Sequence, residues 1–231
     1  MSAPLCLLTR PEPLSAETAA ALPGIDCLIA PILRVVALSF DAAMVADAPG
    51  LVLTSVNAVP HAGPGRGRPA VCVGPQTAAA ARAAGFDVTE GPGDAEGMLP
   101  LLAGRGDWLH LHGRHRARVL PVRGVAVYDQ QALPLEPAAR AALHGQRALI
   151  VPLFSPRSAQ ILSDAVMAAV PAVPVATIAI SARADACWHV PVAHRVIAAR
   201  PERGAMLAAI REAAQTERSG LPWVEAARGG R

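Results

Sequence analysis

The stretch LVLTSVNAV, residues 51–59, is an apolar run that ends at a serine and leads into an alanine-containing helix start. A similar stretch, VPLFSPRSA, residues 151–159, follows about 100 residues later, and a second pair repeats the plan at residues 71–79 and 177–184. Each stretch is typical of a strand that turns directly into a helix. The repetition therefore predicts two related α/β units.

The other apolar runs are mostly continuous rather than alternating, which is typical of strands covered on both faces in a parallel sheet. We expect strands at residues 5–9, 27–30, 51–54, 70–73, 108–111, 148–153, 175–180 and 195–199. Local signals predict helix starts at Ser155, Ser181 and Asp94, and a helix over residues 75–84 that Gly85 ends. The predicted fold class is α/β, with central parallel sheets flanked by helices.

Composition excludes several mechanisms. The chain has 231 residues, of which 52% are hydrophobic and 17% charged, so it has enough apolar surface for real cores. All 21 residues counted as Lys or Arg are arginine, which excludes a Schiff-base lysine and a phosphate loop that ends in Gly-Lys-Ser/Thr. The net charge of +3 mildly favours anionic ligands. Aromatic residues make up only 3% of the chain, so few side chains could stack on nucleic-acid bases, and we expect no nucleic-acid partner.

Cysteine spacing and the terminal segments indicate the compartment. The first residues are apolar before they are basic, the reverse of a secretory signal, and the apolar run 166–180 is interrupted by Pro171 and Pro174. We therefore expect a soluble cytoplasmic protein with no membrane partner, and nothing requires more than a monomer. The four cysteines have no CxxC spacing and are expected to be small buried side chains: Cys6, Cys27, Cys72 and Cys187.

Two motifs are similar to known ligand-binding patterns, but neither supports such a function. The glycines of GPGRG, residues 63–67, precede a predicted strand instead of following one, so they indicate a loop and not a dinucleotide fingerprint. His110 and His112 alternate on one strand face near His115, but no Cys or carboxylate stands close enough to complete a metal site. We expect a polar strand end there and no metal.

Hydroxyl residues follow four of the predicted strands: Ser55, Thr77, Ser155 and Ser181. In parallel α/β sheets these turns lie at the carboxyl edge, where free backbone N–H groups favour anions. Two such edges facing each other would form a cleft for a large polyanion. Arg10 and Arg157 are placed to hold carboxylates, and Tyr128, the only tyrosine, is placed to donate a proton. Taken singly, each hydroxyl is equally consistent with helix capping, each arginine with a solvated surface, and Tyr128 with packing.

Six short motifs follow one another along the chain: LLTRP (7–11), VLTSVNAV (52–59), CVGPQTA (72–78), VAVY (125–128), LFSPRSA (153–159) and IAISA (178–182). In this order they resemble a known family, the uroporphyrinogen-III synthases. The resemblance covers roughly residues 5–214 and rests on the set as a whole, because no single motif is strong.

This resemblance implies two α/β domains joined by a two-stranded linker, with the ligand cleft between them. The first, discontinuous domain would combine residues 1–36 with 130–231, and residues 39–123 would form the inserted domain. Residues 35–38 and 125–128 would be the linker strands. The chain departs from the family pattern where Pro60 shortens the helix after Ser55 and where few residues separate Gly113 from Tyr128, so we expect a small, mobile inserted domain.

The resemblance also implies a reaction. Such synthases cyclise hydroxymethylbilane, a linear tetrapyrrole polycarboxylate, to uroporphyrinogen III with loss of water and inversion of ring D, as a step of haem biosynthesis. No metal or organic cofactor is implied. Tyr128 would be the general acid, since a phenol keeps its proton at neutral pH. Arg10, Arg157 and the four hydroxyl residues would bind the substrate.

Two other functions remain open from the residues alone. One is a non-catalytic two-domain α/β protein that binds an anionic small molecule. The other is a flavodoxin-like flavin protein. The tail from Thr216 to Arg231, rich in Gly and Arg, is expected to lack order.

Overall fold

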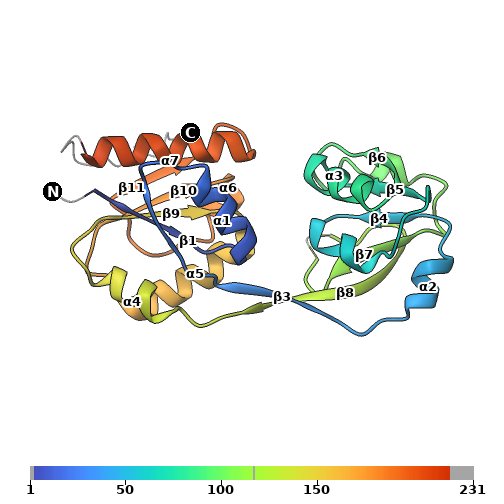
Figure 1. Cartoon of the computed structure of the whole chain (residues 1–231), viewed down its shortest axis with the longest axis horizontal. Coiled ribbons are helices and arrows are strands. Elements are labelled where there is room, and N and C mark those ends of the chain that lie inside the picture. The colour runs from blue at the N-terminus through green and yellow to red at the C-terminus, as the bar shows by residue number, and fades with distance from the viewer. Residues whose placement is uncertain (1–2, 117, 219–231) are drawn as a thin grey trace. The chain divides into compact units, whose positions relative to one another are not determined.

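The chain divides into two compact units in the computed structural model, which describes residues 3–116 and 118–218 (Figure 1). Unit 1 combines Met1–Arg34 with Ala132–Arg231, and unit 2 is Val35–Gln131. The chain therefore leaves unit 1, builds unit 2, and returns to complete unit 1.

Unit 1 contains a five-stranded sheet in the order β11-β10-β9-β1-β2, and all its neighbouring strands are parallel. Every residue of β9 and β10 is buried, which explains why these sequences are continuously apolar. The parallel sheet expected from the apolar runs is thus confirmed for this unit. The strands are β1 (Leu5–Leu8), β2 (Asp26–Ile29), β9 (Leu149–Leu153), β10 (Val175–Ala179) and β11 (His194–Ile197).

Helices cover both faces of this sheet (Figure 1). One core packs α1 (Glu12–Ala20) and α7 (Arg203–Arg218) against Cys6, Leu8 and Ile150. The other packs α4 (Pro137–Leu143), α5 (Pro156–Ala169) and α6 (Ala182–Asp185) against the opposite side chains of the same strands. Burial on both faces fixes the strand ends firmly, so the turns that follow them are well positioned.

Unit 2 contains a six-stranded sheet in the order β3-β8-β7-β4-β5-β6. The pairs β8/β7, β7/β4, β4/β5 and β5/β6 are parallel. β3 pairs antiparallel with β8. Leu38 N–H donates to Val127 O and Leu133 N–H donates to Ile32 O, so residue numbers rise along one strand as they fall along the other. The sheet of unit 2 is therefore mixed: its other strand pairs are parallel, and β3, which contains residues 35–37 of the expected linker strand, pairs antiparallel with β8. Its strands are β3 (Leu33–Ala37), β4 (Leu51–Leu53), β5 (Pro69–Cys72), β6 (Asp87–Glu90), β7 (Leu109–Gly113) and β8 (Arg123–Ala132).

The helices of unit 2 are short. α2 (Ala42–Asp47), the 3-10 helix η1 (Val56–His61) and α3 (Pro75–Ala83) pack on one face of the sheet, and the 3-10 helix η2 (Leu99–Leu102) packs on the other. Pro60 lies inside η1, which agrees with the expectation that this proline shortens the helix after Ser55.

Local signals mislead at three places. β6 was not expected, because it is a largely polar edge strand in which only Val88 packs against the core. Asp94 begins no α-helix: its carboxylate accepts a hydrogen bond from Gly97 N–H over a turn that leads to η2. Thr216 lies in α7, so the disorder expected from that residue onward is wrong as far as Arg218, and residues 219–231 lie outside the described part of the chain.

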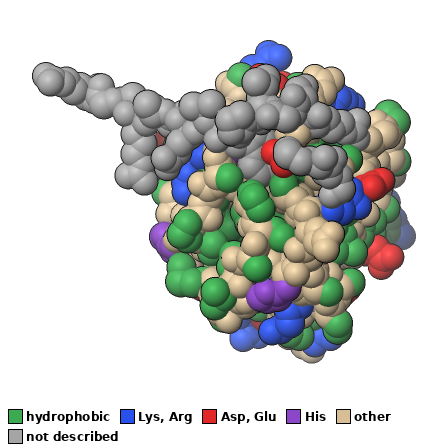
Figure 2. All heavy atoms as spheres, turned by 90° about the vertical axis from the view of Figure 1, so that its left-hand side faces the viewer, with side chains coloured by type: hydrophobic (Ala, Val, Ile, Leu, Met, Phe, Trp, Pro, Cys, Tyr) green, Lys and Arg blue, Asp and Glu red, His purple; other side chains and the backbone are tan. Residues whose placement is uncertain are grey.

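Figure 2 shows one face of unit 1. In the described part of that face, hydrophobic side chains gather at the centre and charged ones lie apart around the outline. None of the described helices has the length and apolar character needed to cross a membrane.

Candidate active site

In unit 1, three adjacent strands lead to predicted site residues. Arg10 follows β1, Ser155 follows β9 and Ser181 follows β10, in a sheet whose order is β10-β9-β1 (Figure 1). Parallel strands share one carboxyl edge, so the structure brings these residues together there. Arg157 joins them from the first turn of α5.

Arg10 is held by its surroundings rather than extended into solvent. Its guanidinium carbon lies 4.5 Å from the centre of the Phe154 ring, and Ser15 Oγ donates to its backbone carbonyl. Burial, opposed by Glu17 and assisted by Arg203, lowers the pKa of the Arg10 guanidinium, although an arginine still keeps its charge near neutrality. A partly desolvated, stacked guanidinium is a strong partner for a carboxylate.

Ser155 and Ser181 both cap helices, as predicted. Ser155 Oγ accepts from Ser158 N–H at 3.1 Å and lies 2.7 Å from Ser158 Oγ, and Ser181 Oγ accepts from Ala184 N–H at 3.3 Å. α5 has 14 residues, so its N-terminus carries a useful positive potential, whereas α6 has only 4. The edge of unit 1 therefore combines a cation, a helix N-terminus and hydroxyl groups.

Unit 2 arranges its predicted residues in the same way. Tyr128 lies in β8, Ser55 follows β4 and Thr77 lies in the first turn of α3 after β5, and these strands belong to the run β8-β7-β4-β5. Ser55 caps η1, accepting from Asn57 N–H at 3.2 Å. Thr77 is buried. At the carboxyl edge of its parallel strands, unit 2 thus places a partly exposed Ser55 and two buried hydroxyl residues, Thr77 and Tyr128.

Tyr128 is fixed by a glycine that the sequence analysis did not single out. Its ring lies directly against Gly113, the last residue of β7, and a β-carbon there would be only 2.6 Å from Tyr128 Cε2 and 3.0 Å from Oη. The strand register shifts between His112 and Gly113, so that Gly113 pairs with Tyr128. Arg114 N–H then donates to Tyr128 O at 2.9 Å. Tyr128, a residue that is 6% exposed, is therefore held through contacts of both its ring and its backbone.

His110 and His112 are interior residues, not the polar strand end that was expected. They are 2% and 7% exposed, and their ring centroids are 5.0 Å apart. His110 Nε2 lies 2.8 Å from Thr54 Oγ1, and His112 Nδ1 lies 2.7 Å from Gly113 O, to which it donates. Burial, with His112 and Arg116 adding repulsion, lowers the pKa of His110 to about 3. Both rings are therefore buried parts of unit 2 that pack below the carboxyl edge of its sheet.

This burial predicts a pH-dependent stability. The pKa of folded His110 lies below its unfolded value, so the unfolded chain binds more protons and stability falls as the pH drops from about 6.5 toward 3. We expect wild type to lose roughly 2–3 kcal/mol more than His110→Gln between pH 7 and pH 4. Urea unfolding at both pH values measures the difference. His144→Gln, which changes an exposed histidine, is the control. Parallel loss in wild type and His110→Gln would contradict the prediction.

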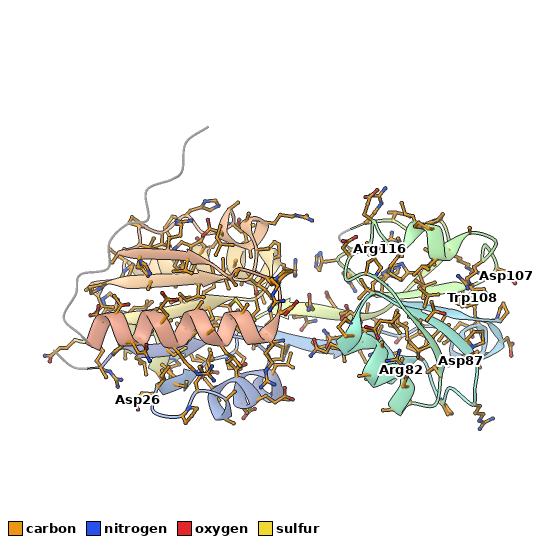
Figure 3. The ribbon with its side chains drawn as sticks, turned by 90° about the horizontal axis from the view of Figure 1, so that it is seen from above. Asp26, Arg82, Asp87, Asp107, Trp108 and Arg116 are labelled. Atoms are coloured by element: carbon orange, nitrogen blue, oxygen red, sulfur yellow. The ribbon has the colours of Figure 1, made fainter. Side chains whose placement is uncertain are left out.

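A charged cluster beside Tyr128 also escaped the sequence analysis. Asp129, whose side chain is 13% exposed, lies between Arg114 Nε at 3.4 Å and His115 Nε2 at 3.7 Å. Arg116 follows at the same end of unit 2, opposite the end that carries Asp87 and Asp107 (Figure 3). The Arg114 and His115 side chains are exposed, so the turn after β7 offers an accessible guanidinium and an imidazole beside Asp129.

Two surface cavities lie elsewhere. One of about 380 Å³ is lined by residues that precede or begin β4, β7 and β8, including Asp107 and Arg123, and one of about 530 Å³ is formed by the loop 62–68 before β5. Both belong to the amino-terminal side of the strands, away from the hydroxyl residues. Within the described residues, no group of three or more His, Cys, Asp or Glu is arranged to hold a metal ion.

Comparison with known families identifies the chain's relatives. Residues 16–208 match the family model described as uroporphyrinogen-III synthase HemD. The chain belongs to the uroporphyrinogen-III synthase family. A search of curated protein sequences gives no match. The resemblance found from six short motifs is thereby confirmed at the level of family.

Solved uroporphyrinogen-III synthases share the fold of this family member. The enzyme from Helicobacter pylori has 16% sequence identity and a TM-score of 0.61, with 92% of this chain and 100% of that chain covered. A mutant enzyme from the extremely thermophilic bacterium Thermus thermophilus has 17% identity and a TM-score of 0.54, with 93% and 100% covered. At such identities the likeness supports the fold alone.

The sequence analysis missed three features of this family member: the contact between Gly113 and Tyr128, the buried histidine pair and the charged cluster at Asp129. The Gly at the end of LHLHG was the one available signal, because a glycine in a strand often marks a bulge or a close approach. The histidine burial and the ion pairs depend on which residues the fold brings together, and no spacing in the sequence indicates them.

Proposed function

We propose that this chain is a uroporphyrinogen-III synthase, which cyclises hydroxymethylbilane to uroporphyrinogen III with loss of water and inversion of ring D. The family match over residues 16–208 carries the proposal. The two carboxyl edges support it, because hydroxyls, a helix N-terminus and arginines suit a substrate with many carboxylates.

In the proposed mechanism Tyr128 is the general acid. Its phenol gives a proton to the hydroxyl of the bilane, the C–O bond breaks, and water leaves. The lone pair of the adjacent pyrrole nitrogen drives that departure and yields an azafulvene cation. Ring D then joins through its substituted carbon as a spiro intermediate, and rearrangement gives the inverted ring. A pyrrole carbon finally loses a proton, which makes up for the proton that Tyr128 gave, so the net change is loss of one water molecule.

Most of the rate and all of the isomer choice come from holding the bilane in shape. We propose that Arg10, Arg157 and the N-terminus of α5 bind carboxylates, and that Ser55, Thr77, Ser155 and Ser181 bind carboxylates or pyrrole N–H groups. We further propose that the two units act as domains, 1–36 with 130–231 and 39–123, with 35–38 and 125–128 as linker strands. Both domains would bind one bilane molecule in the cleft between them.

A coupled assay tests the function. Hydroxymethylbilane is generated in place, the products are oxidised, and the porphyrin isomers are separated. We expect isomer III with the protein present and isomer I, the product of spontaneous closure, without it. Isomer I alone in the presence of folded protein would overturn the synthase proposal and would leave an anion-binding protein as the alternative.

Ser155 allows its capping role to be separated from its proposed binding role. Ser155→Ala removes the cap of α5 and is expected to cost about 1 kcal/mol of stability, which Ser155→Asp restores because Asp is an equally good N-cap. Ser155→Asp nevertheless places a negative charge where we propose that a carboxylate binds. We expect thermal unfolding near wild type and a raised KM for the bilane in this variant. An unchanged KM would show that Ser155 only caps the helix.

A further inference from the structure

Two cysteines of unit 1 face each other across neighbouring strands. Cys6 in β1 and Cys27 in β2 are direct register partners in a parallel pair. Paired residues of adjacent strands point to the same side of the sheet, and strands are about 4.8 Å apart. Disulfides join residues whose Cα atoms are about 4.4–6.8 Å apart, so this pair lies within bonding range.

The two thiols differ in their exposure to solvent. Cys6 is completely buried in the core beneath α7, whereas Cys27 is partly exposed and its Sγ lies 3.5 Å from Ile25 O. β2 is the last strand of its sheet, with its other edge unpaired in the described chain, so it can shift slightly toward β1. A small oxidant can therefore reach Cys27 first, and Cys6 lies next to Cys27 on the neighbouring strand.

Exposure assigns different roles to the two sulfurs. Cys27 is the accessible nucleophile, and Cys6, its buried register partner, is the resolving thiol. The hydrogen bond between the two thiols lowers the pKa of Cys27 and raises that of Cys6, which agrees with these roles. By contrast, burial raises the pKa of Cys72 to about 11, and its register partners are Leu53 and Glu90. The Cys187 thiol donates to Arg183 O.

We propose that Cys6 and Cys27 form a reactive dithiol that a hydroperoxide converts to an intramolecular disulfide. The Cys27 thiolate attacks the peroxide O–O bond, giving a sulfenic acid and releasing the alcohol or water. The Cys6 thiol then attacks the Cys27 sulfur, forming the S–S bond and releasing a water molecule. The peroxide is reduced by two electrons and the thiol pair is oxidised by two. This site is independent of the synthase proposal.

Mass spectrometry of the folded full-length protein treated with hydrogen peroxide tests the pair. No arginine that trypsin can cut separates Cys6 from Cys27, because Pro11 follows Arg10, so one tryptic peptide, residues 1–34, should lose two hydrogen atoms. Cleavage after Glu17 should then leave two fragments joined until dithiothreitol is added. We expect this peptide to react at least about tenfold faster than the Cys72 peptide.

Matched variants locate the reaction. Cys187→Ser, which removes the other partly exposed thiol of unit 1, should form the cross-link at the wild-type rate, and Cys27→Ser should form none. The oxidised wild type should also unfold at a higher temperature, since the bond constrains the unfolded chain. Accumulation of Cys27 sulfinic acid without a cross-link, or a cross-link that forms only in denaturant, would overturn the proposal. Because the wild type carries the main measurement, misfolding of a variant does not obscure the result.

Discussion

Tyr128→Phe is expected to lower kcat for formation of isomer III by roughly 10²- to 10³-fold, the usual contribution of a positioned general acid. The variant keeps the ring that packs against Gly113 and loses only the hydroxyl, so the fold should be unchanged. KM should stay within a few-fold, because the proposed carboxylate contacts come from other residues. The coupled isomer assay at saturating bilane measures both constants.

Two controls make the result specific. Circular dichroism and thermal unfolding should match wild type, which separates loss of the proton donor from loss of structure. Tyr128→Leu, which removes both hydroxyl and ring, should be less stable, whereas Tyr128→Phe should not. Wild-type turnover in Tyr128→Phe at saturating bilane would remove Tyr128 from the mechanism while leaving the family assignment intact.

Gly113→Ala is expected to reduce kcat nearly as much as loss of the hydroxyl. The added β-carbon would be 2.6 Å from Tyr128 Cε2 and 2.7 Å from Cζ, closer than such atoms can approach, so the ring must move away. A proton donor displaced by an ångström loses most of its catalytic value. The same overlap should cost about 1–3 kcal/mol of stability. Kinetics and urea unfolding measure the two effects.

A double variant shows whether Gly113 acts through the phenol. If it does, Gly113→Ala combined with Tyr128→Phe should have the kcat of Tyr128→Phe alone, because the hydroxyl is already absent. Gly106→Ala serves as the control, since this glycine precedes the same strand and a β-carbon there meets no atom within 4 Å. If the decreases in kcat of the two single variants multiply in the double variant, Gly113 supports activity by another route.

The strands of the sheets were largely predictable where both faces are buried. β9 and β10 appear in the sequence as continuous apolar runs because neither face meets water. β6 was missed because an edge strand with one core side chain, Val88, produces no such run. The antiparallel direction of β3 could not be predicted from its side chains, because strand direction follows from chain connectivity.

Local chemistry was likewise predictable where one residue acts on its immediate neighbours. Ser155 and Ser181 cap helices as expected, because an N-cap bond spans only three residues. The histidine pair was misjudged because alternation says which side chains share a face and not whether another layer covers that face. The cysteines were expected to be small buried side chains, which is wrong for Cys27 and Cys187, since both are partly exposed. The pairing of Cys6 with Cys27 is revealed only by the strand register.

The sequence by itself determined the α/β class, the helix caps at Ser155 and Ser181, and the family, because these depend on periodicity, on neighbours a few residues apart and on the order of short motifs. Only the tertiary structure decided that Gly113 supports Tyr128, that Asp129 lies between Arg114 and His115, and that Cys6 faces Cys27. Such contacts join residues that lie on different strands and turns, far apart along the chain. Their formation depends on strand register and the burial of whole layers, which arise only when the complete sheet is assembled.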